Sequence, residues 1–368
     1  MRHSRSVWSV KIQNTESVRK MKKYDYAVVI GRFQPLHNAH LELIRYSLGL
    51  AEKVIIVLGS ARSAPDIRNP FTPAMREEII RACLPSEDKR LVFRAVRDYP
   101  YNDHVWTAEV QNAVGELSDE DGTESPRVGI VGFFKDKSSY YLNLFPQWDF
   151  EEFYCSDKRL LNLNATEIRE KYFGEDDTWR GLVPAVVAAY LDAFRETEFY
   201  PALKGEFEYL KKYREDTRFV GVPYKPVFLT TDAVVVQSGH VLVIRRGFQP
   251  GKGLLALPGG FLADNLTLED SALKELKEET NIKVPAQVLR GSIKASHVFD
   301  FPERSLRGRT VTFAYYIELA PDLKEGLPRV KGGDDAKKAF WLPLSALGEK
   351  EDEFFEDHIH IIRYFLGI

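Results

Sequence analysis

Residues 26–40 read YAVVIGRFQPLHNAH, an apolar run followed by a glycine, a proline and two histidines. The run has the composition of a buried strand, and the glycine and the proline end it. His37 and His40 then begin a helix that the pattern predicts over residues 37–50. Side chains three positions apart share a helix face, so the two imidazoles should lie together at the helix N-terminus.

The same alternation of apolar runs and helical patterns continues through the first half of the chain. Strand, helix and strand in repeated order predict a parallel sheet wrapped by helices, which is an α/β domain. Ligands of such domains bind at the carboxyl ends of the strands. The other expected strands are at residues 54–60, 91–96 and 128–133, and the other expected helices are at 73–83, from 166, at 183–194 and near 202–214.

The pattern changes after residue 215. Residues 228–246, FLTTDAVVVQSGHVLVIRR, predict two strands joined by a hairpin turn. Strands expected at residues 288–293 and 310–317 have no alternating helices, so the second half should be an α+β domain. The expected units are a disordered extension, an α/β domain and an α+β domain, at residues 1–22, 23–215 and 222–368.

Composition excludes several classes of protein. With 51 Lys and Arg against 54 Asp and Glu, the net charge is −3, so the general basic field of a nucleic-acid-binding protein is missing. No apolar run reaches the roughly 20 residues of a membrane span, so no membrane partner is expected. Two cysteines, Cys83 and Cys155, cannot build a disulfide framework, which favours a cytoplasmic location.

The start of the first helix has the properties of an anion site. Free N–H groups and the positive end of the helix dipole lie there, and Arg32 adds a fixed charge. Two histidines at this spacing alone most often mark a surface turn. The whole stretch GRFQPLHNAH, however, resembles the HxGH signature of the nucleotidylyltransferase superfamily, in the form particular to nicotinamide-mononucleotide adenylyltransferases. Residues 164–169, NATEIR, resemble the second superfamily signature, Ser-x-Thr-x-x-Arg, with Asn164 in place of Ser, and Ala39 replaces a glycine of the first.

The resemblance implies a Rossmann-like fold and a direct transfer of AMP from ATP to the mononucleotide. Such a transfer needs positioning and positive charge rather than a protein nucleophile. Trp106 falls where the family stacks an aromatic ring on nicotinamide, and Phe133 replaces a family histidine. The implied catalytic residues are His37, His40 and Arg169, and the implied ATP and mononucleotide contacts are Gly31, Arg32, Phe33, Arg68, Arg76, Trp106, Lys135, Asp136 and Thr166.

A second motif lies at residues 257–282, LPGGFLADNLTLEDSALKELKEETNI. Glu275, Glu278 and Glu279 share one helix face, where three carboxylates repel one another unless cations neutralise them. Mg²⁺, or Mn²⁺, bridging a diphosphate suits such oxygen ligands. The plainer alternative is a solvated acidic face. The stretch resembles the Nudix box, which implies that these three glutamates are metal ligands and catalytic residues, although Leu266 and Lys274 replace the Glu and Arg of the box.

Residues 296–317 and 331–344 resemble ADP-ribose pyrophosphatases that are fused to an adenylyltransferase domain. The resemblance implies a C-terminal Nudix domain that splits ADP-ribose into AMP and ribose 5-phosphate, and a first domain that makes NAD from ATP and nicotinamide mononucleotide. A homo-oligomer is possible. Asp334 and Asp335 are expected on the metal side, and the implied ADP-ribose contacts are Gly260, Arg304, Arg307 and Arg309.

Two alternatives stay open at this point. The first half could adenylylate another phosphorylated substrate, such as pantetheine phosphate, although Trp106 and the GRFQP form argue against it. The second half could be a non-catalytic Nudix-like sensor that only binds a nucleotide. No helix-turn-helix pattern accompanies it, and three glutamates on one helix face are unnecessary for binding alone.

Residues 1–20 have no apolar period, and the pattern typical of the family opens at Met21. We therefore expect a protein that starts at Met21 to fold and to keep both activities. The measurement compares the thermal unfolding and the turnover of the full-length and shortened proteins. A shortened protein that fails to fold, or that loses either activity, contradicts the assignment of these residues as a dispensable extension.

Overall fold

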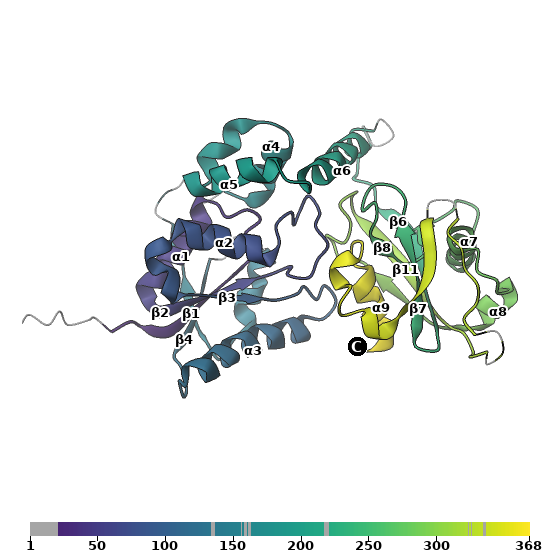
Figure 1. Ribbon diagram of the computed structural model, residues 1–368, viewed down its shortest axis with the longest axis horizontal. Coiled ribbons are helices and arrows are strands. Elements are labelled where there is room, and N and C mark those ends of the chain that lie inside the picture. The colour runs from purple at the N-terminus through teal and green to yellow at the C-terminus, as the bar shows by residue number, and fades with distance from the viewer. Residues whose placement is uncertain are drawn as a thin grey trace, which may run out of the picture.

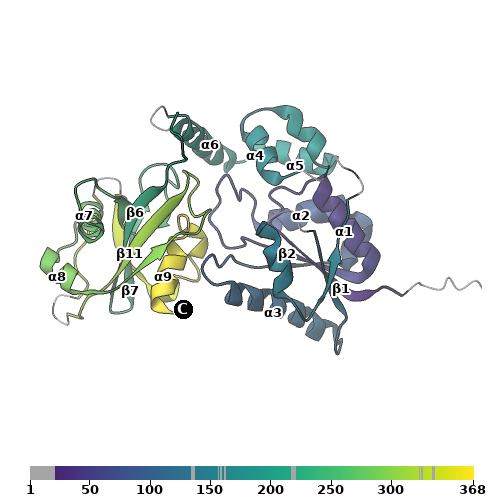
Figure 2. The same ribbon diagram turned by 180° about the vertical axis from the view of Figure 1, so that it is seen from behind.

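Two sheets, one in each half of the chain, lie side by side in the computed structural model (Figure 1). Helix α6 (Tyr200–Arg214) lies between them at one edge, and the view from behind gives the same arrangement (Figure 2). The structure describes residues 21–133, 137–155, 157, 160, 163–216, 221–322, 324, 326–333 and 336–368.

The first sheet is parallel throughout, with strand order β3-β2-β1-β4-β5. Its central strands are Val- and Ile-rich and buried on both faces, which is typical of parallel sheets covered by helices on both sides. The carboxyl ends of β1 and β4 meet at one edge. The strands are β1 (Tyr24–Gly31), β2 (Ala51–Leu58), β3 (Leu91–Ala95), β4 (Val128–Gly132) and β5 (Asp149–Glu152).

Helices cover both faces of this sheet. Val29 packs in the core under α1, α2, α4 and α5, whereas its neighbour Val28 packs in the core under α3, because successive strand residues point to opposite faces. Three short 3-10 helices complete this half, η1 (Pro85–Arg90), η2 (Lys137–Leu144) and η3 (Asp177–Leu182). The α-helices are α1 (Asn38–Leu50), α2 (Pro73–Cys83), α3 (Asp103–Asp121), α4 (Ala165–Phe173) and α5 (Ala185–Arg195).

Polar side chains fix where these helices begin. Thr72, Asn102 and Asn164 each accept a hydrogen bond from the backbone N–H three residues later, at the starts of α2, α3 and α4. Pro73 occupies the first position of α2, where its missing N–H is not needed. The asparagine that replaces the signature serine at 164 therefore still caps its helix.

The second sheet has the order β10-β11-β6-β7-β12, with β8 paired to β7 and β9 paired to β6. Strands β6 and β11 are parallel, and the other pairs are antiparallel. Ser238 and Gly239 both have positive φ, as a tight two-residue hairpin requires. The strands are β6 (Phe228–Gln237), β7 (His240–Arg246), β8 (Leu255–Ala256), β9 (Gly259–Phe261), β10 (Ile293–Phe299), β11 (Thr310–Glu318) and β12 (Ala336–Pro343).

Helices also cover both faces of the second sheet. Helix α9 (His358–Leu366) packs on one face, and α7 (Leu268–Thr280) and α8 (Ala286–Gly291) pack on the other. Two short 3-10 helices, η4 (Leu344–Ala346) and η5 (Glu351–Glu353), precede α9. Within the described residues, no helix has the length and apolar character needed to cross a membrane.

The structure confirms the α/β and α+β halves, corrects one local prediction and adds two elements that were not predicted. The strand expected at residues 288–293 is wrong, because helix α8 occupies Ala286–Gly291 and strand β10 begins at Ile293. A run as short as VLRGSI fits a strand or one helical turn equally well. The prediction also named neither the 19-residue helix α3 nor the edge strand β5, whose sequence, DFEE, has three acidic residues out of four.

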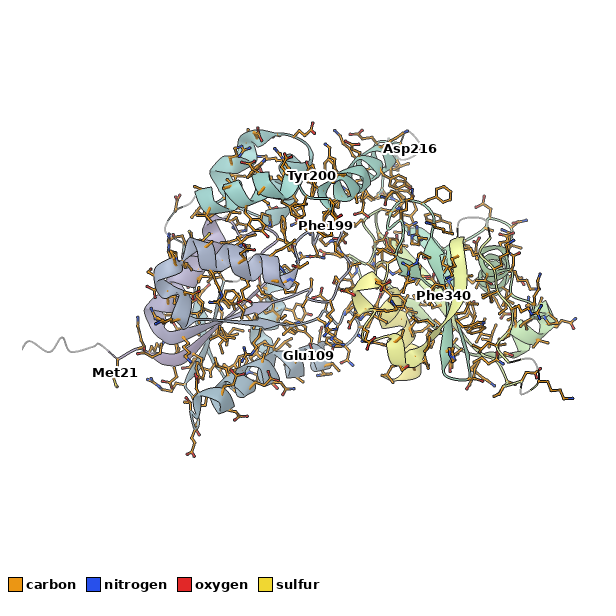
Figure 3. All side chains as sticks on the ribbon, in the orientation of Figure 1. Met21, Glu109, Phe199, Tyr200, Asp216 and Phe340 are labelled. Carbon is orange, nitrogen blue, oxygen red and sulfur yellow. The ribbon has the colours of Figure 1, made fainter. Side chains whose placement is uncertain are left out.

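Several contacts join the two halves, and side chains from both reach into the space between the ribbons (Figure 3). Tyr101, which precedes α3, packs edge-on against Phe299 with ring centroids 5.0 Å apart. Its hydroxyl donates to Asp357 at the start of α9. Arg97 lies 3.2 Å from Glu351, and the buried Glu351 also pairs with Arg363. The first half therefore adds an aromatic ring to the core of the second.

Asp357 and Arg304 form a buried, two-pronged ion pair, with Nε and Nη2 of the arginine 2.9 and 2.8 Å from the two carboxylate oxygens. Burial would raise the pKa of Asp357, but the adjacent Arg304 guanidinium outweighs burial and holds that pKa below its usual value. A carboxyl group with a lowered pKa stabilises the folded state above its unfolded pKa. That contribution is lost as pH falls through the folded pKa.

Replacing Asp357 with Ala should lower the free energy of unfolding of the second half by about 3–5 kcal/mol, because Arg304 is left buried and unpaired. Urea unfolding followed by tryptophan fluorescence and by circular dichroism measures this loss. The matched control is Asp300→Ala, since Asp300 pairs at 3.7 Å with Arg309 on the surface, where such a pair contributes about 0–1 kcal/mol. Equal losses in the two variants would contradict the structural role of the buried pair.

Candidate functional site

The turn after β1 forms the first candidate site, and Gln34 holds it in place. The Gln34 side chain is buried, donates to the Phe71 carbonyl at 2.9 Å and accepts from the Phe71 N–H at 3.0 Å. Phe33 has a positive φ of 51°, which directs its ring back under Gly31, where a Cβ would lie 2.9 Å from the ring. The loop before α2 is therefore fastened to the GRFQP turn.

His37 and His40 lie together at the start of α1, as the sequence predicts. Their rings are stacked with centroids 3.5 Å apart. His37 is the N-cap of the helix, and its Nδ1 accepts a hydrogen bond from the His40 N–H at 3.4 Å. In a neutral ring, this bond places the proton on Nε2, so that His37 presents a donor to an anion.

Arginine side chains surround the same turn. Arg169 is buried and donates to the Gln34 carbonyl at 2.6 Å and to the Thr166 hydroxyl at 3.2 Å. Burial, together with the positive charges of Arg32 and Arg68, lowers the pKa of Arg169 to about 10, although the nearby Asp66 opposes this shift. An anion bound beside this buried guanidinium would stabilise its charged form.

Arg76 and Arg68 have structural partners of their own. The Nη1 of Arg76 donates to the carbonyls of Arg32 and Gly59, at 2.8 and 2.7 Å, while its buried Nη2 has no hydrogen-bond partner among the described residues. Arg68 donates across the junction to the Glu303 carbonyl at 2.7 Å. Phosphate contact by either arginine stays a prediction, and for Arg76 the remaining donor is Nη2.

Trp106 is in the first turn of α3 and packs edge-on against Tyr141 and Phe145, with centroids 6.0 and 5.9 Å away. It is only partly buried. Stacking on nicotinamide therefore stays a prediction for a ring that its neighbours hold in place. Lys135 and Asp136 lie outside the described residues.

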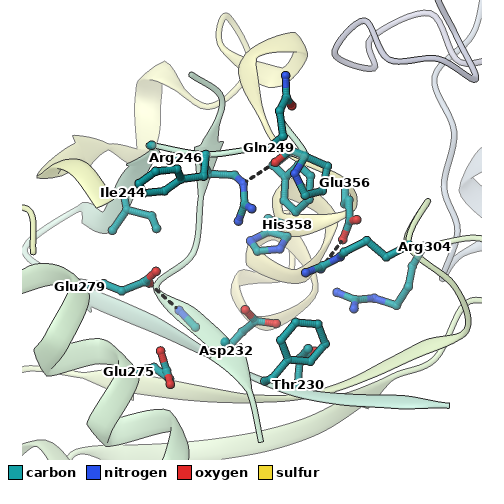
Figure 4. Close-up of a pocket in the computed structure, with 18 of the residues that line it drawn as sticks. Thr230, Asp232, Ile244, Arg246, Gln249, Glu275, Glu279, Arg304, Glu356 and His358 are labelled. Carbon is teal, nitrogen blue, oxygen red and sulfur yellow. Dashed lines mark hydrogen bonds and ion pairs between the residues drawn. The ribbon is translucent and has the colours of Figure 1, made fainter. Parts of the chain in front are cut away.

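The second candidate site is a cavity of about 400 Å³ in the second half (Figure 4). Residues from strands β6 and β7, from helix α7 and from the segment before α9 surround it. Its lining is Tyr209, Thr230, Asp232, Ile244, Arg246, Gly247, Phe248, Gln249, Pro250, Gly259, Gly260, Phe261, Glu275, Glu279, Arg304, Arg307, Phe355, Glu356 and His358.

One end of this cavity is acidic. Glu279 is buried and accepts a hydrogen bond from the Gly259 N–H at 2.9 Å. Burial, together with the charges of Glu275 and Asp232, raises the pKa of Glu279 to about 8. A Cβ on Gly260 would lie 2.8 Å from the Glu275 carboxylate, so the PGG turn lets the backbone approach the acidic groups closely.

Glu278 is not among the lining residues. It is exposed and forms an ion pair with Lys274 at 2.8 Å. Among the described residues, no three acidic, histidine or cysteine side chains are gathered into a metal-binding group. Glu275 and Glu279 nevertheless fit a hard divalent cation, because they offer only oxygen ligands and the charge of Glu275 opposes ionisation of Glu279. Asp334 and Asp335 lie outside the described residues.

The three arginines predicted to bind ADP-ribose have different positions. Arg304 lines the cavity, but its guanidinium is committed to Asp357. Arg307 also lines it, 5.1 Å from the centre of the Phe261 ring. Arg309 is outside the lining and donates to the Asp300 carbonyl. Arg307 is paired more loosely, 3.8 Å from Glu356, so of these three arginines it is the best placed to meet a ligand.

Sequence analysis missed several residues of this cavity. Asp232 lies within the apolar strand β6 and accepts from the Thr312 hydroxyl at 2.6 Å, so an acid inside an apolar run was the available signal. Arg246 lies with its guanidinium carbon 4.1 Å from the centre of the Phe355 ring. Tyr209 comes from α6, whose amphipathic sequence gives no sign of a cavity formed by residues 230–358.

Comparisons with protein families match each half separately. The family described as "NUDIX domain" matches residues 228–365, and the family described as "Cytidylyltransferase-like" matches residues 28–112. A nicotinamide/nicotinic acid mononucleotide adenylyltransferase of Acinetobacter baylyi is 37% identical over 188 residues, which are 51% of this chain and 95% of the relative. An ADP-ribose pyrophosphatase of Methanocaldococcus jannaschii is 29% identical over 157 residues, which are 43% of this chain and 79% of the relative.

One solved structure spans both halves. It is described as a bifunctional NMN adenylyltransferase/ADP ribose pyrophosphatase from Francisella tularensis, complexed with AMP and a Mn ion. The match has 34% identity and a TM-score of 0.83, and it covers 94% of this chain and 99% of the other. The similarity therefore extends over the order of the two halves as well as over each fold.

Proposed function

The chain belongs to the family of bifunctional NMN adenylyltransferase/ADP-ribose pyrophosphatases, and we propose how its residues divide that work. The first half joins AMP from ATP to nicotinamide mononucleotide, giving NAD and pyrophosphate. The second half hydrolyses ADP-ribose to AMP and ribose 5-phosphate. The observation that carries the proposal is the presence of two clusters, a cationic one after β1 and an acidic one beside α7. They lie in a chain that is similar to a bifunctional structure over 94% of its length.

In the first half, the proposed task of the protein is to bind and align two anions. His37 and His40 hold the triphosphate at the N-terminus of α1, and Arg169 holds its pyrophosphate end. The mononucleotide phosphate then attacks the α-phosphorus in line, and the pyrophosphate leaves toward the cations. Donors fixed before the reaction stabilise the charge that develops on the departing oxygens.

In the second half, Glu275 and Glu279 are the proposed metal ligands, with Asp232 beside them. The chemistry that a bound Mg²⁺ or Mn²⁺ supplies is neutralisation and polarisation of the diphosphate. The Gly259 N–H orients the Glu279 carboxylate, and the glycine turn lets the diphosphate approach without a steric barrier. Arg307 is the proposed contact for the negative charge of the substrate.

Replacing His40 with Ala should lower the rate of NAD synthesis by roughly 10²–10³-fold, because one contact to the charge of the transition state is lost. Hydrolysis of ADP-ribose should not change. Chromatographic assay of NAD and AMP measures both activities in the same preparation. The matched control is His240→Ala, in the β6–β7 hairpin. Near-normal synthesis by the His40 variant would show that the histidine pair is only a helix cap.

Replacing Glu279 with Gln should abolish metal-dependent cleavage of ADP-ribose and leave NAD synthesis intact, because one negative charge is removed from the metal-binding cluster. Titration with Mn²⁺ measures the weakened metal binding directly. Glu269→Gln is the control on the same helix, since Glu269 pairs with Arg290 on the surface. Robust turnover by the Glu279 variant would leave the carboxylates as no more than a polar helix face.

The alternative second function is a sensor that binds ADP-ribose without cleaving it. Ion pairing of Glu278 with Lys274 on the surface favours this alternative, because it takes one predicted ligand out of the cavity. Calorimetric binding of ADP-ribose by the wild-type protein, with no AMP formed in the presence of Mg²⁺ or Mn²⁺, would establish the sensor.

A further inference from the structure

Helix α6 belongs to the first half of the chain, yet it supplies part of the wall of the second cavity. Tyr209 lines this cavity, 19 residues before the stretch that matches the NUDIX domain begins at 228. Its side chain is 37% exposed, so the ring has a face that a ligand can cover. The cavity is thus incomplete in the residues of the second domain alone.

Hydrogen bonds from the middle and from the C-terminal end of α6 hold this helix beside the cavity. Glu206, one turn before Tyr209, is buried and accepts from the Gly251 N–H at 3.3 Å and from the Ile67 N–H at 3.2 Å. Arg214, near the end of α6, donates to the Leu306 carbonyl at 2.9 Å. The helix therefore has a fixed position beside two loops that line the cavity, 247–250 and 304–307.

Aromatic side chains also line the cavity beside its acidic groups. Centroid distances of 6.1, 6.2 and 5.9 Å connect Tyr209 to Tyr213, Tyr213 to Phe228 and Phe228 to Phe261. Phe261 is 44% exposed, and the guanidinium of Arg307 lies over it. Tyr209 and Phe261 both line the cavity with partly exposed rings, and Tyr213 and Phe228, which lie outside the lining, connect them.

The two moieties that flank the diphosphate of ADP-ribose differ in what they offer to such a wall. Adenosine has a flat aromatic base, whereas the second ribose has only hydroxyl groups. Aromatic side chains bind bases by stacking, and this contact does not depend on hydrogen bonding to the base. The carboxylates are the proposed metal ligands beside the diphosphate, so the aromatic side chains of the lining are available to the base.

Resting on the proposed hydrolysis of ADP-ribose, we propose that Tyr209 is a specificity-determining residue of the second site. Its ring covers the nucleobase of the substrate, and helix α6 thereby makes the first half part of the binding site of the second. In this proposal Tyr209 contributes to binding of the base, and the bond-breaking step depends on the carboxylates of Glu275 and Glu279.

Kinetics of the full-length protein test this assignment through Tyr209→Ala and Tyr209→Phe. The Ala variant should raise KM for ADP-ribose by about 5- to 150-fold, the range for loss of one base-stacking contact, with kcat within about twofold of wild type. The Phe variant keeps the ring and should retain the wild-type KM. Tyr154→Ala, in an exposed tyrosine of the first half, is the matched control.

Product inhibition separates the two moieties of the substrate. In the Tyr209→Ala variant, inhibition by AMP should weaken about as much as KM rises, while inhibition by ribose 5-phosphate should stay unchanged. An unchanged KM, equal weakening for both products, or a Phe variant as impaired as the Ala variant would overturn the proposal. Failure of the proposed function is distinguishable, because the wild-type protein itself would then form no AMP.

Discussion

Each half of this protein must hold ionisable side chains of one kind close together before a ligand arrives, guanidinium groups in the first half and carboxyl groups in the second. In the first half, Arg169 is buried near other guanidinium groups, and in the second, Glu279 is buried near Glu275 and Asp232. Such clusters are unfavourable by themselves, so rigid neighbours must maintain them. After β1, the cluster is held in place by the side chain of Gln34 and by the hydrogen bonds of Arg76 to two carbonyls. In the second half, it is held in place by the Gly259 N–H and by helix α7. An oppositely charged ligand relieves the repulsion. Both sites therefore suit phosphate chemistry, because the cationic cluster can bind phosphate directly and the acidic cluster can bind the divalent cation that neutralises a diphosphate.

The junction between the halves is part of this arrangement. Tyr101 completes the aromatic core around Phe299 and donates to Asp357, which in turn neutralises the buried Arg304. Glu206 contacts the backbone of both halves, and burial, with the charge of Asp66, raises its pKa to about 7. The contacts of Glu206 fix α6 beside the second cavity. A residue of the first half, Tyr209, therefore lines a cavity whose other lining residues belong to the second half.

Sequence patterns predicted the parallel sheet, the hairpin and the bounds of α2, because buried strands, turn residues and helix caps are local signals. The histidine pair also lies together as its spacing predicted. Residues 286–293 were misassigned because Val288 and Leu289 form an apolar pair that fits either kind of element, although only Leu289 is buried. Arg304 could not be distinguished from Arg307, since its partner Asp357 lies 53 residues away along the chain. Tyr209 carried no local signal either, because its position at a cavity depends on how two separate folds pack together.

The central claim is that one chain performs two reactions on nucleotides at two separate sites. Chromatography of the products tests it most directly. The purified full-length protein is incubated with ATP, Mg²⁺ and nicotinamide mononucleotide, and separately with ADP-ribose and Mg²⁺ or Mn²⁺. The account predicts NAD and pyrophosphate in the first reaction, and AMP and ribose 5-phosphate in equal amounts in the second. Absence of NAD from the first reaction, or recovery of intact ADP-ribose from the second, would contradict it.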